Sequence, residues 1–148
     1  MYVLDTDTYS NYVKDNKQIR KRLAQHPIEK IHLSVVTAEE LYKGRLRSIN
    51  EAREKNSSEI SRAFDGLVEL TRQMDFFRQQ HRLLRYTEEA EALFQSWPSA
   101  IKRAGSQDCR IAAIACVNDF CVVTCNTRHF ARIQDLTGVK VEDWSIAE

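Results

Sequence analysis

Three acidic residues, distant from one another in the sequence, have side chains suited to metal-assisted chemistry on phosphate esters. Asp5 directly follows the apolar run 2–4. Glu40 lies shortly after a second apolar run, 31–36, and Asp108 begins an alanine-rich segment. Converging carboxylates repel one another unless a cation or protons intervene, and Mg²⁺ suits them because it prefers oxygen ligands. A metal held in this way can activate water and stabilise charge on a phosphodiester.

The same acids also fit a purely structural role. Aspartate and glutamate are common in the first turn of helices, where they complement the helix dipole. Asp7, Glu40 and Asp108 all stand where helices are expected to begin. From residue types and spacing alone, helix capping and a shared metal site are both open.

The first acid is expected at the junction of a strand and a helix. Residues 2–4 are typical of a buried parallel strand, which places Asp5 at its carboxyl end. Thr6 and Asp7 are predicted to cap a helix that begins near Thr8. In open parallel sheets, ligands collect at this edge, next to helix N-termini.

The second acid follows a second strand. Residues 31–36 predict that strand, and Thr37 is the expected N-cap of the helix from Ala38 onward. Glu40 then occupies the position of a capping box, three residues after the cap. Glu39 is the acid next to it.

The rest of the chain continues this alternation of helices and strands. Apolar residues recur at spacings of three and four through 58–84, which predicts a long helix. Thr87 is expected to cap the next helix, and Pro98 predicts a break before residues 99–104. The other expected elements are a helix at 16–25, short strands at 83–86, 121–124 and 140–144, and a small-residue helix that begins at Asp108 and ends near 117–119.

Composition and length predict one domain. The chain has 148 residues, of which 43% are hydrophobic and 29% charged. A domain of this size buries roughly 70% of the surface its unfolded chain exposes, so it needs no disulfides. Strands that alternate with helices predict a three-layer α/β/α sandwich with a mainly parallel central sheet, spanning residues 1–148.

Cysteine usage and the N-terminus indicate a cytoplasmic protein. No basic, apolar leader precedes the first strand, and no window resembles a membrane helix. In a reducing cytosol the thiols are expected to be free. They are Cys109, Cys116, Cys121 and Cys125.

Positive charge is local, because the net charge is only +1. Two basic runs, within 14–30 and 43–55, are either solvated helix faces or contacts for phosphates. Charge alone does not decide between these two interpretations.

Five short motifs occur in order along nearly the whole chain. They are residues 3–7 around Asp5, 34–41 followed by Gly44, 108–115, 123–130, and Leu136 with 141–144. Together they resemble the PIN-domain family, and within it the VapC-like ribonuclease toxins of bacterial toxin–antitoxin pairs.

The resemblance implies cleavage of RNA that depends on Mg²⁺ or Mn²⁺. Asp5 and Asp108 would provide most of the metal binding, and Glu40 would complete the cluster directly or through water. Arg110 and Arg128 become candidates for holding the RNA backbone. The residues expected in the pocket or in substrate binding are Thr6, Thr124, Asn126, His129, Arg110 and Arg128.

The sequence departs from the family at the fourth acid. Many members have an acid just before the phenylalanine that corresponds to Phe130, where this chain has His129. Asn126, the other place for an acid, is also neutral. His129 either holds a metal-bound water or a scissile phosphate, or is a tolerated surface residue. The loss bears on a second metal more than on the first.

The resemblance also implies partners. It implies a small cognate antitoxin whose tail enters the acidic pocket, with an arginine facing the carboxylates. It implies a homodimer formed through helices, to which residues 58–84 would contribute. The alternatives are a PIN fold that has lost catalysis and binds RNA or a protein, and a nuclease that acts on DNA.

Overall fold

A five-stranded sheet forms the centre of the protein. The computed structural model describes residues 1–147, and its strands pair in parallel in the order β3-β2-β1-β4-β5. The predicted α/β fold with a mainly parallel sheet is confirmed. The strands are β1 (Tyr2–Leu4), β2 (Ile31–Ser34), β3 (Leu83–Leu84), β4 (Cys121–Val123) and β5 (Val141–Glu142).

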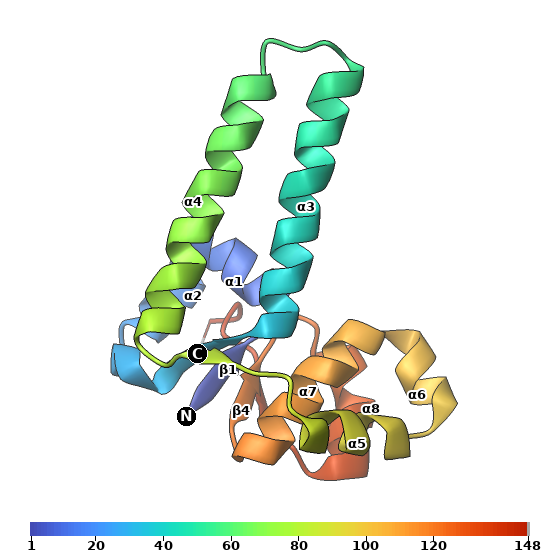
Figure 1. The fold of residues 1–148 in the computed structure, drawn as a ribbon. Coiled ribbons are helices and arrows are strands. Elements are labelled where there is room, and N and C mark those ends of the chain that lie inside the picture. Colours follow the sequence, from blue (N-terminus) through green and yellow to red (C-terminus); the bar gives the residue numbers. More distant parts are fainter. Residues whose placement is uncertain (148) are drawn as a thin grey trace.

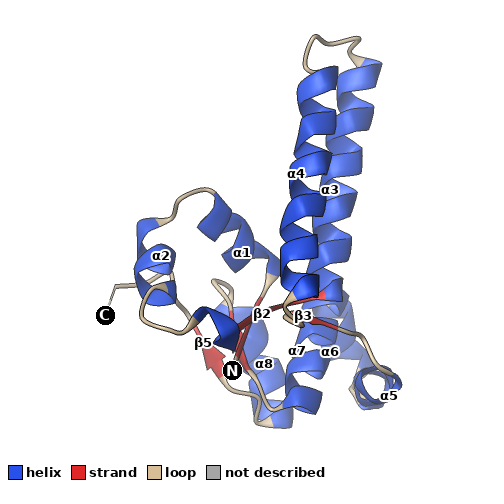
Figure 2. Cartoon of the chain, turned by 60° about the vertical axis from the view of Figure 1, so that its left-hand side comes forward, coloured by secondary structure: helices blue, strands red, loops and turns tan. Residues whose placement is uncertain are grey.

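Helices cover both faces of this sheet. Side chains alternate between the two faces along each strand, so each strand contributes buried apolar side chains to both faces. Val3 and Val122 pack in one core cluster, whereas Leu4 and Val123 pack in the other. Residues of α5, α7 and α8, with Val36 of α3, form the first cluster, and residues of α1, α2, α3 and α4 form the second. Figure 2 shows how these helices surround the strands. The helices are α1 (Thr6–Val13), α2 (Lys17–Leu23), α3 (Val35–Glu54), α4 (Ile60–Gln79), α5 (Glu88–Ser96), α6 (Ser99–Ala104), α7 (Ser106–Asn118), α8 (Thr127–Thr137) and the 3-10 turn η1 (Ile28–Lys30).

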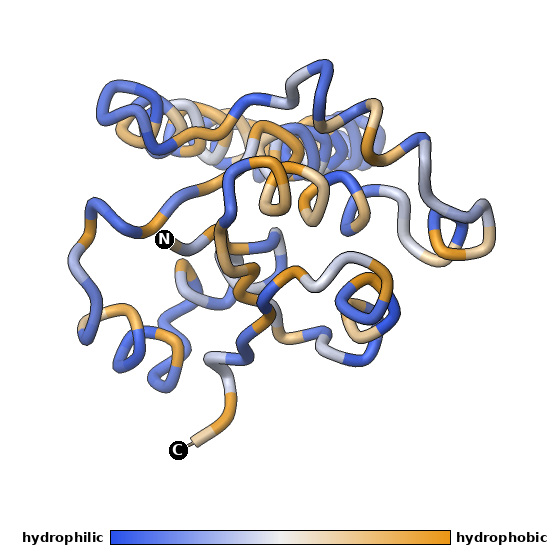
Figure 3. Tube along the Cα trace, turned by 90° about the horizontal axis from the view of Figure 1, so that it is seen from below, coloured by the Kyte–Doolittle hydropathy of each residue, from blue (hydrophilic) through white to orange (hydrophobic). Residues whose placement is uncertain are grey.

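Helices α3 and α4 form an antiparallel hairpin that rises from the body (Figure 1). Leu70, Met74 and Phe77 of α4 are buried where the hairpin meets the sheet. Farther out, Leu46, Phe64 and Val68 are exposed. The tube in Figure 3 changes repeatedly between hydrophobic and hydrophilic along the helices, as expected for amphipathic elements packed on one side.

The long helix predicted for 58–84 is shorter in the structure. Helix α4 ends at Gln79, and His81 adopts a left-handed conformation with φ 55°. The backbone carbonyl of Arg82 then accepts a hydrogen bond from Leu33 N–H at 3.0 Å, which starts the pairing of β3 with β2. The short strand expected at this point is confirmed at Leu83–Leu84.

Several predicted helix boundaries are confirmed. The Thr87 hydroxyl accepts a hydrogen bond from Ala90 N–H at 3.2 Å and caps α5. Pro98 separates α5 from the short helix α6, and Asp119 ends α7 with φ 53°. The four cysteines are free thiols. Within residues 1–147, no helix is both long and apolar enough to cross a membrane.

Candidate active site

Asp5 joins β1 directly to α1 and is almost fully buried, with 3% of its surface exposed. Its Oδ1 accepts a hydrogen bond from Thr8 N–H at 2.8 Å, so Asp5 itself is the N-cap. The expectation that Thr6 and Asp7 cap a helix starting near Thr8 is therefore wrong. The helix begins at Thr6 because the strand passes into it with no intervening loop.

The environment of Asp5 raises the pKa of its carboxyl group. Burial is the main cause, and the negative charge of Asp108 adds to it. Hydrogen bonds from Thr124 and Thr8 act in the opposite direction. Thr124 is itself held in place, because its hydroxyl accepts a hydrogen bond from Asn126 N–H at 2.9 Å. The carboxylate is thus well oriented but costly to ionise.

Glu40 lies in the second turn of α3 and faces α1. Its Oε1 accepts a hydrogen bond from the Thr6 hydroxyl at 2.8 Å. The pKa of Glu40 is raised, first by burial and then by the charges of Asp108, Asp7 and Asp5. The sequence indicated Asp7 only as a helix cap, whereas its charge also acts on Glu40 at this site.

The N-cap of α3 also differs from the expectation. Ser34 caps the helix, since its hydroxyl accepts a hydrogen bond from Thr37 N–H at 3.1 Å. Thr37 lies inside the first turn, so its predicted role as N-cap is wrong and Glu40 is not part of a capping box. The Glu40 carboxylate is consequently available for another purpose.

Glu39, the neighbouring acid, points into a different environment. It pairs with Lys43 at 2.6 Å and accepts a hydrogen bond from Gln107 at 3.0 Å. These contacts lower its pKa. Glu39 is therefore a solvated surface acid. Glu40 is half-buried, and other carboxylates raise its pKa.

Asp108 stands in the first turn of α7, whose small residues allow close packing against the sheet. Ala112, Ala113 and Ala115 have no exposed surface. Asp108 Oδ2 and His129 Nδ1 lie 2.6 Å apart, which links α7 to α8. The helix therefore holds the third acid at a fixed place beside the sheet.

The topology explains how these acids meet. Strands β2, β1 and β4 are adjacent and parallel, so the segments that follow them lie at one edge of the sheet. Asp5 follows β1, and Glu40 lies on the helix that follows β2. Asp108 raises the pKa of both Asp5 and Glu40. Three carboxylates from distant parts of the chain thus share one electrostatic environment.

The PIN domain family model matches residues 2–136. The chain belongs to the PIN-domain family. Among curated protein sequences, none matches it significantly.

Solved structures with the same fold cover nearly the whole chain. VapBC from Salmonella typhimurium, bound to DNA, is 26% identical with a TM-score of 0.66, over 97% of each chain. VapBC-1 from nontypeable Haemophilus influenzae is 23% identical with a TM-score of 0.64, over 98% of each chain. VapBC2 from Rickettsia felis, bound to a promoter DNA fragment, is 18% identical with a TM-score of 0.65, over 97% of this chain and 98% of that one. The predicted resemblance to VapC-like PIN domains is confirmed.

The donor set of this PIN domain fits a hard divalent cation. Asp5, Glu40 and Asp108 all offer carboxylate oxygens, the ligands that Mg²⁺ and Mn²⁺ prefer. Within residues 1–147, no three His, Cys, Asp or Glu side chains are already gathered as a metal site. Hydrogen bonds hold each of the three acids separately. Binding of one ion by all three requires these side chains to turn toward a common point.

The other residues expected at the site have separate surroundings. Thr6 and Thr124 contact the acids directly, as described above. Asn126 and Arg128 are exposed near the start of α8. Arg110 packs its guanidinium 4.4 Å from the centre of the Phe94 ring, on the α5 side of α7. Roles for these last three in RNA binding stay predictions.

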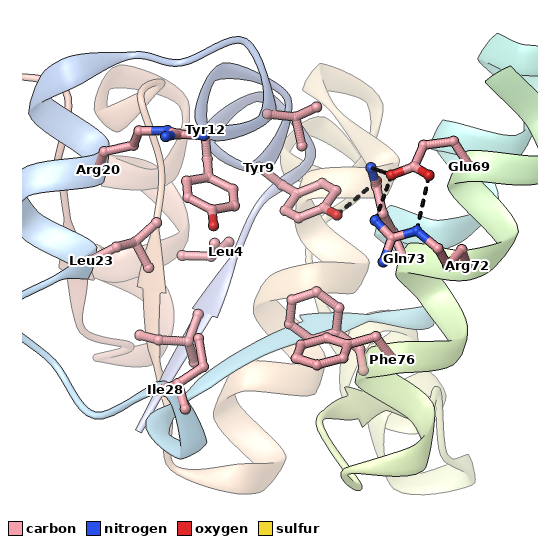
Figure 4. A pocket seen from close by; sticks show the side chains of 13 residues that line it. Leu4, Tyr9, Tyr12, Arg20, Leu23, Ile28, Glu69, Arg72, Gln73 and Phe76 are labelled. Atoms are coloured by element: carbon pink, nitrogen blue, oxygen red, sulfur yellow. Dashed lines mark hydrogen bonds and ion pairs between the residues drawn. The ribbon is translucent and has the colours of Figure 1, made fainter.

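A groove of about 500 Å³ lies on the other side of α1, between α1 and α2 and helix α4 (Figure 4). The Tyr9 hydroxyl donates a hydrogen bond to Gln73 across it at 2.9 Å. Charged residues stand among the apolar ones, including a pair in which Arg72 donates two hydrogen bonds to Glu69. The apolar lining includes Leu4, Tyr12, Leu23, Ile28 and Phe76.

Proposed function

We propose that this PIN domain is a Mg²⁺-dependent endoribonuclease and the toxin of a toxin–antitoxin pair. The observation that carries the proposal is the electrostatic coupling of the three acids, since the charge of Asp108 raises the pKa values of both Asp5 and Glu40. PIN domains are generally nucleases. The solved neighbours are structures of toxins with their antitoxins, two of those described above also bound to DNA, which supports the toxin role and an antitoxin partner.

The side chains around the acids have distinct tasks in this proposal. Mg²⁺, or Mn²⁺ in its place, supplies activation of water and neutralisation of charge on the phosphodiester. Thr8 N–H and the Thr124 hydroxyl orient Asp5. The Thr6 hydroxyl orients Glu40, and His129 holds Asp108. These partners lie at helix and strand ends, so each acid is held at a defined place from which it can turn toward a common ion.

The pair Glu39 and Glu40 provides the test. Glu40→Gln keeps an oxygen for the Thr6 hydroxyl but removes the charge, so cleavage is expected to fall by roughly a hundredfold or more, which corresponds to about 3 kcal/mol of transition-state stabilisation. Glu39→Gln removes a charge one residue away, on the solvated face, and is expected to leave the rate within about threefold.

The assay uses purified protein with matched RNA and DNA strands, in Mg²⁺ and in EDTA. RNA cleavage that stops in EDTA and in Glu40→Gln, but persists in Glu39→Gln, supports the proposal. Cleavage of the DNA strand alone would instead identify a nuclease that acts on DNA. Intact RNA binding without cleavage in any metal would identify a PIN module that binds without catalysis.

We propose that the antitoxin docks in the groove between α1, α2 and α4. An amphipathic segment fits such a surface, since its apolar face can cover Tyr12, Ile28 and Phe76 while Arg20 and Arg72 meet its polar edge. Ile28 and Phe76 are 57% and 46% exposed, so they gain burial when covered. The homodimer expected from the family stays a prediction.

Phe76→Asp is expected to weaken antitoxin binding by on the order of 30-fold, because it places a charge in the apolar groove. The matched control is Val68→Asp on the same helix, where Val68 is 69% exposed and does not line the groove. Binding is measured by calorimetry with a purified antitoxin that inhibits RNA cleavage by the wild type. Equal affinities of the two variants would rule out the groove, and RNA cleavage by free Phe76→Asp checks that the site is intact.

A further inference from the structure

The imidazole of His129 is fixed against the N-terminal end of α7. Its Nδ1 lies 2.6 Å from Asp108 Oδ2, and the side chains of His129 and Asp108 are 14% and 29% exposed. The next residue, Phe130, is fully buried, with its ring centre 6.0 Å from that of His129. Residue 129 is therefore not a loose surface side chain, which was one of the two readings that the sequence left open.

Gly105 makes room for this ring. A Cβ atom at position 105 would lie 2.1 Å from Cε1 and 2.8 Å from Nε2 of His129, closer than nonbonded atoms approach. The φ angle of Gly105 is 174°, which is extended backbone that other residues adopt. The requirement for glycine at this position is therefore space for the imidazole, not conformational freedom.

The two nitrogens of the ring are used differently. Nδ1 is bonded to Asp108, whereas Nε2 is buried and, within residues 1–147, has no hydrogen-bond partner. Because Nε2 makes no such hydrogen bond, it does not hold the ring in place. Its burial without a partner instead costs free energy. On the carboxylate, Oδ2 is the oxygen that contacts the ring.

We propose that His129 is a positioning residue for Asp108, and that the absence of a side chain at Gly105 leaves the space that the imidazole needs in order to reach Asp108. The ring holds Oδ2 from one side and leaves Oδ1 to bind the divalent cation. Residue 129 thus acts on the metal through the third acid rather than as a ligand, where many relatives have a fourth acid. The inference rests on the proposed function, because it takes Asp108 as a metal ligand.

Partners that orient metal ligands typically contribute 10- to 100-fold in metal affinity or activity. His129→Ala is therefore expected to weaken Mn²⁺ binding, measured by calorimetry on the intact protein without RNA, by roughly 10- to 100-fold. At saturating Mn²⁺, the KM for RNA is expected to stay unchanged, because the ring is not proposed to touch RNA.

Two conservative variants distinguish the ring nitrogens. The amide nitrogen of asparagine occupies a place similar to Nδ1, and that of glutamine a place similar to Nε2. His129→Asn is expected to restore Mn²⁺ affinity to within about threefold of wild type, and His129→Gln is expected to resemble His129→Ala. Restoration by glutamine but not asparagine would overturn the proposal and assign the active role to Nε2.

Gly105→Ala tests the gap. It is expected to displace the ring and to weaken Mn²⁺ binding as much as His129→Ala does. When His129 is already alanine, the added Cβ has space, so the double variant should bind Mn²⁺ like His129→Ala alone. Gly44→Ala is the matched control, since a Cβ at Gly44 meets nothing within 4 Å. Additive losses in the double variant would contradict a shared mechanism.

The outcomes separate this inference from the proposed function. If wild type binds Mn²⁺ and cleaves RNA while His129→Ala and Gly105→Ala do so equally well, only the positioning role is overturned. If wild type binds no Mn²⁺ at millimolar concentration, both proposals fail. Thermal melts identify any variant that is unfolded, and nitrogen-15 spectra of the His129 imidazole in wild type and Gly105→Ala report whether the Nδ1 hydrogen bond is present.

Discussion

Asp5→Asn is expected to reduce metal-dependent cleavage by on the order of a thousandfold, because it removes the most buried of the charges proposed to bind the cation. The fold is expected to survive. Asparagine caps helices about as well as aspartate, and its Oδ1 can still accept the hydrogen bond from Thr8 N–H that starts α1.

The same change is expected to stabilise the metal-free protein. Burial and the charge of Asp108 raise the pKa of Asp5, so ionisation of Asp5 at neutral pH costs folding free energy. Asparagine carries no charge and avoids this cost. The melting temperature in EDTA is therefore expected to rise by a few degrees, while activity is lost.

Single-turnover RNA cleavage and circular-dichroism melts measure the two effects. Asp135→Asn, an exposed acid on α8, is the control and should change neither. Cleavage by Asp5→Asn at more than about a tenth of the wild-type rate would refute the role of Asp5 in metal binding. A large drop in melting temperature would show instead that Asp5 serves mainly as a structural cap.

The alternation of strands and helices could be predicted because local signals and the global fold agree. The apolar run 2–4 is strand β1, and the run predicted as a strand at 31–36 is strand β2 only as far as Ser34, because Val35 and Val36 already belong to α3. The caps were less predictable, since Ser34 and Thr37 have similar side chains three residues apart. Only the backbone geometry decides that Ser34 caps α3.

Long-range contacts explain what the sequence could not reveal. The end of α4 depends on the hydrogen bond from Leu33 N–H to the carbonyl of Arg82, which joins segments far apart in the chain. The contact of His129 with Asp108, and the space at Gly105 that permits it, likewise arise from the packing of α7 against α8. The periodicity of apolar residues predicts which residues share one face of a helix, but it does not predict which residues of two different helices are in contact.

The second large effect is an expected dependence of the protein's stability on pH and on a bound divalent cation. Asp5 and Glu40 have raised pKa values in the folded protein. Their contribution to stability is therefore fully present below their unfolded pKa values, about 3.9 and 4.3, and is lost as pH rises through the raised folded values. In EDTA, this pair should lower the melting temperature as pH increases from acidic to neutral.

A divalent cation is expected to reverse this loss, because it binds the ionised carboxylates. At a free concentration a hundred times the dissociation constant, binding contributes about 2.7 kcal/mol, which corresponds to a rise of roughly 5–11 °C in melting temperature for a domain of this size. The rise should be largest near neutral pH and should disappear in acid, where the carboxylates are protonated. Melts in EDTA and in Mn²⁺ across this pH range measure it.

The comparison must be made between wild type and Asp5→Asn, because other acids have the opposite sign. Hydrogen bonds and nearby cations lower the pKa values of Glu39 and Glu69, that of Glu69 to about 2, so these acids favour folding as pH rises. Both groups are unchanged in the variant, and their effect cancels in the difference. A difference that does not depend on pH, or a Mn²⁺ effect as large in Asp5→Asn as in wild type, would show that the raised pKa of Asp5 and the metal site are not linked.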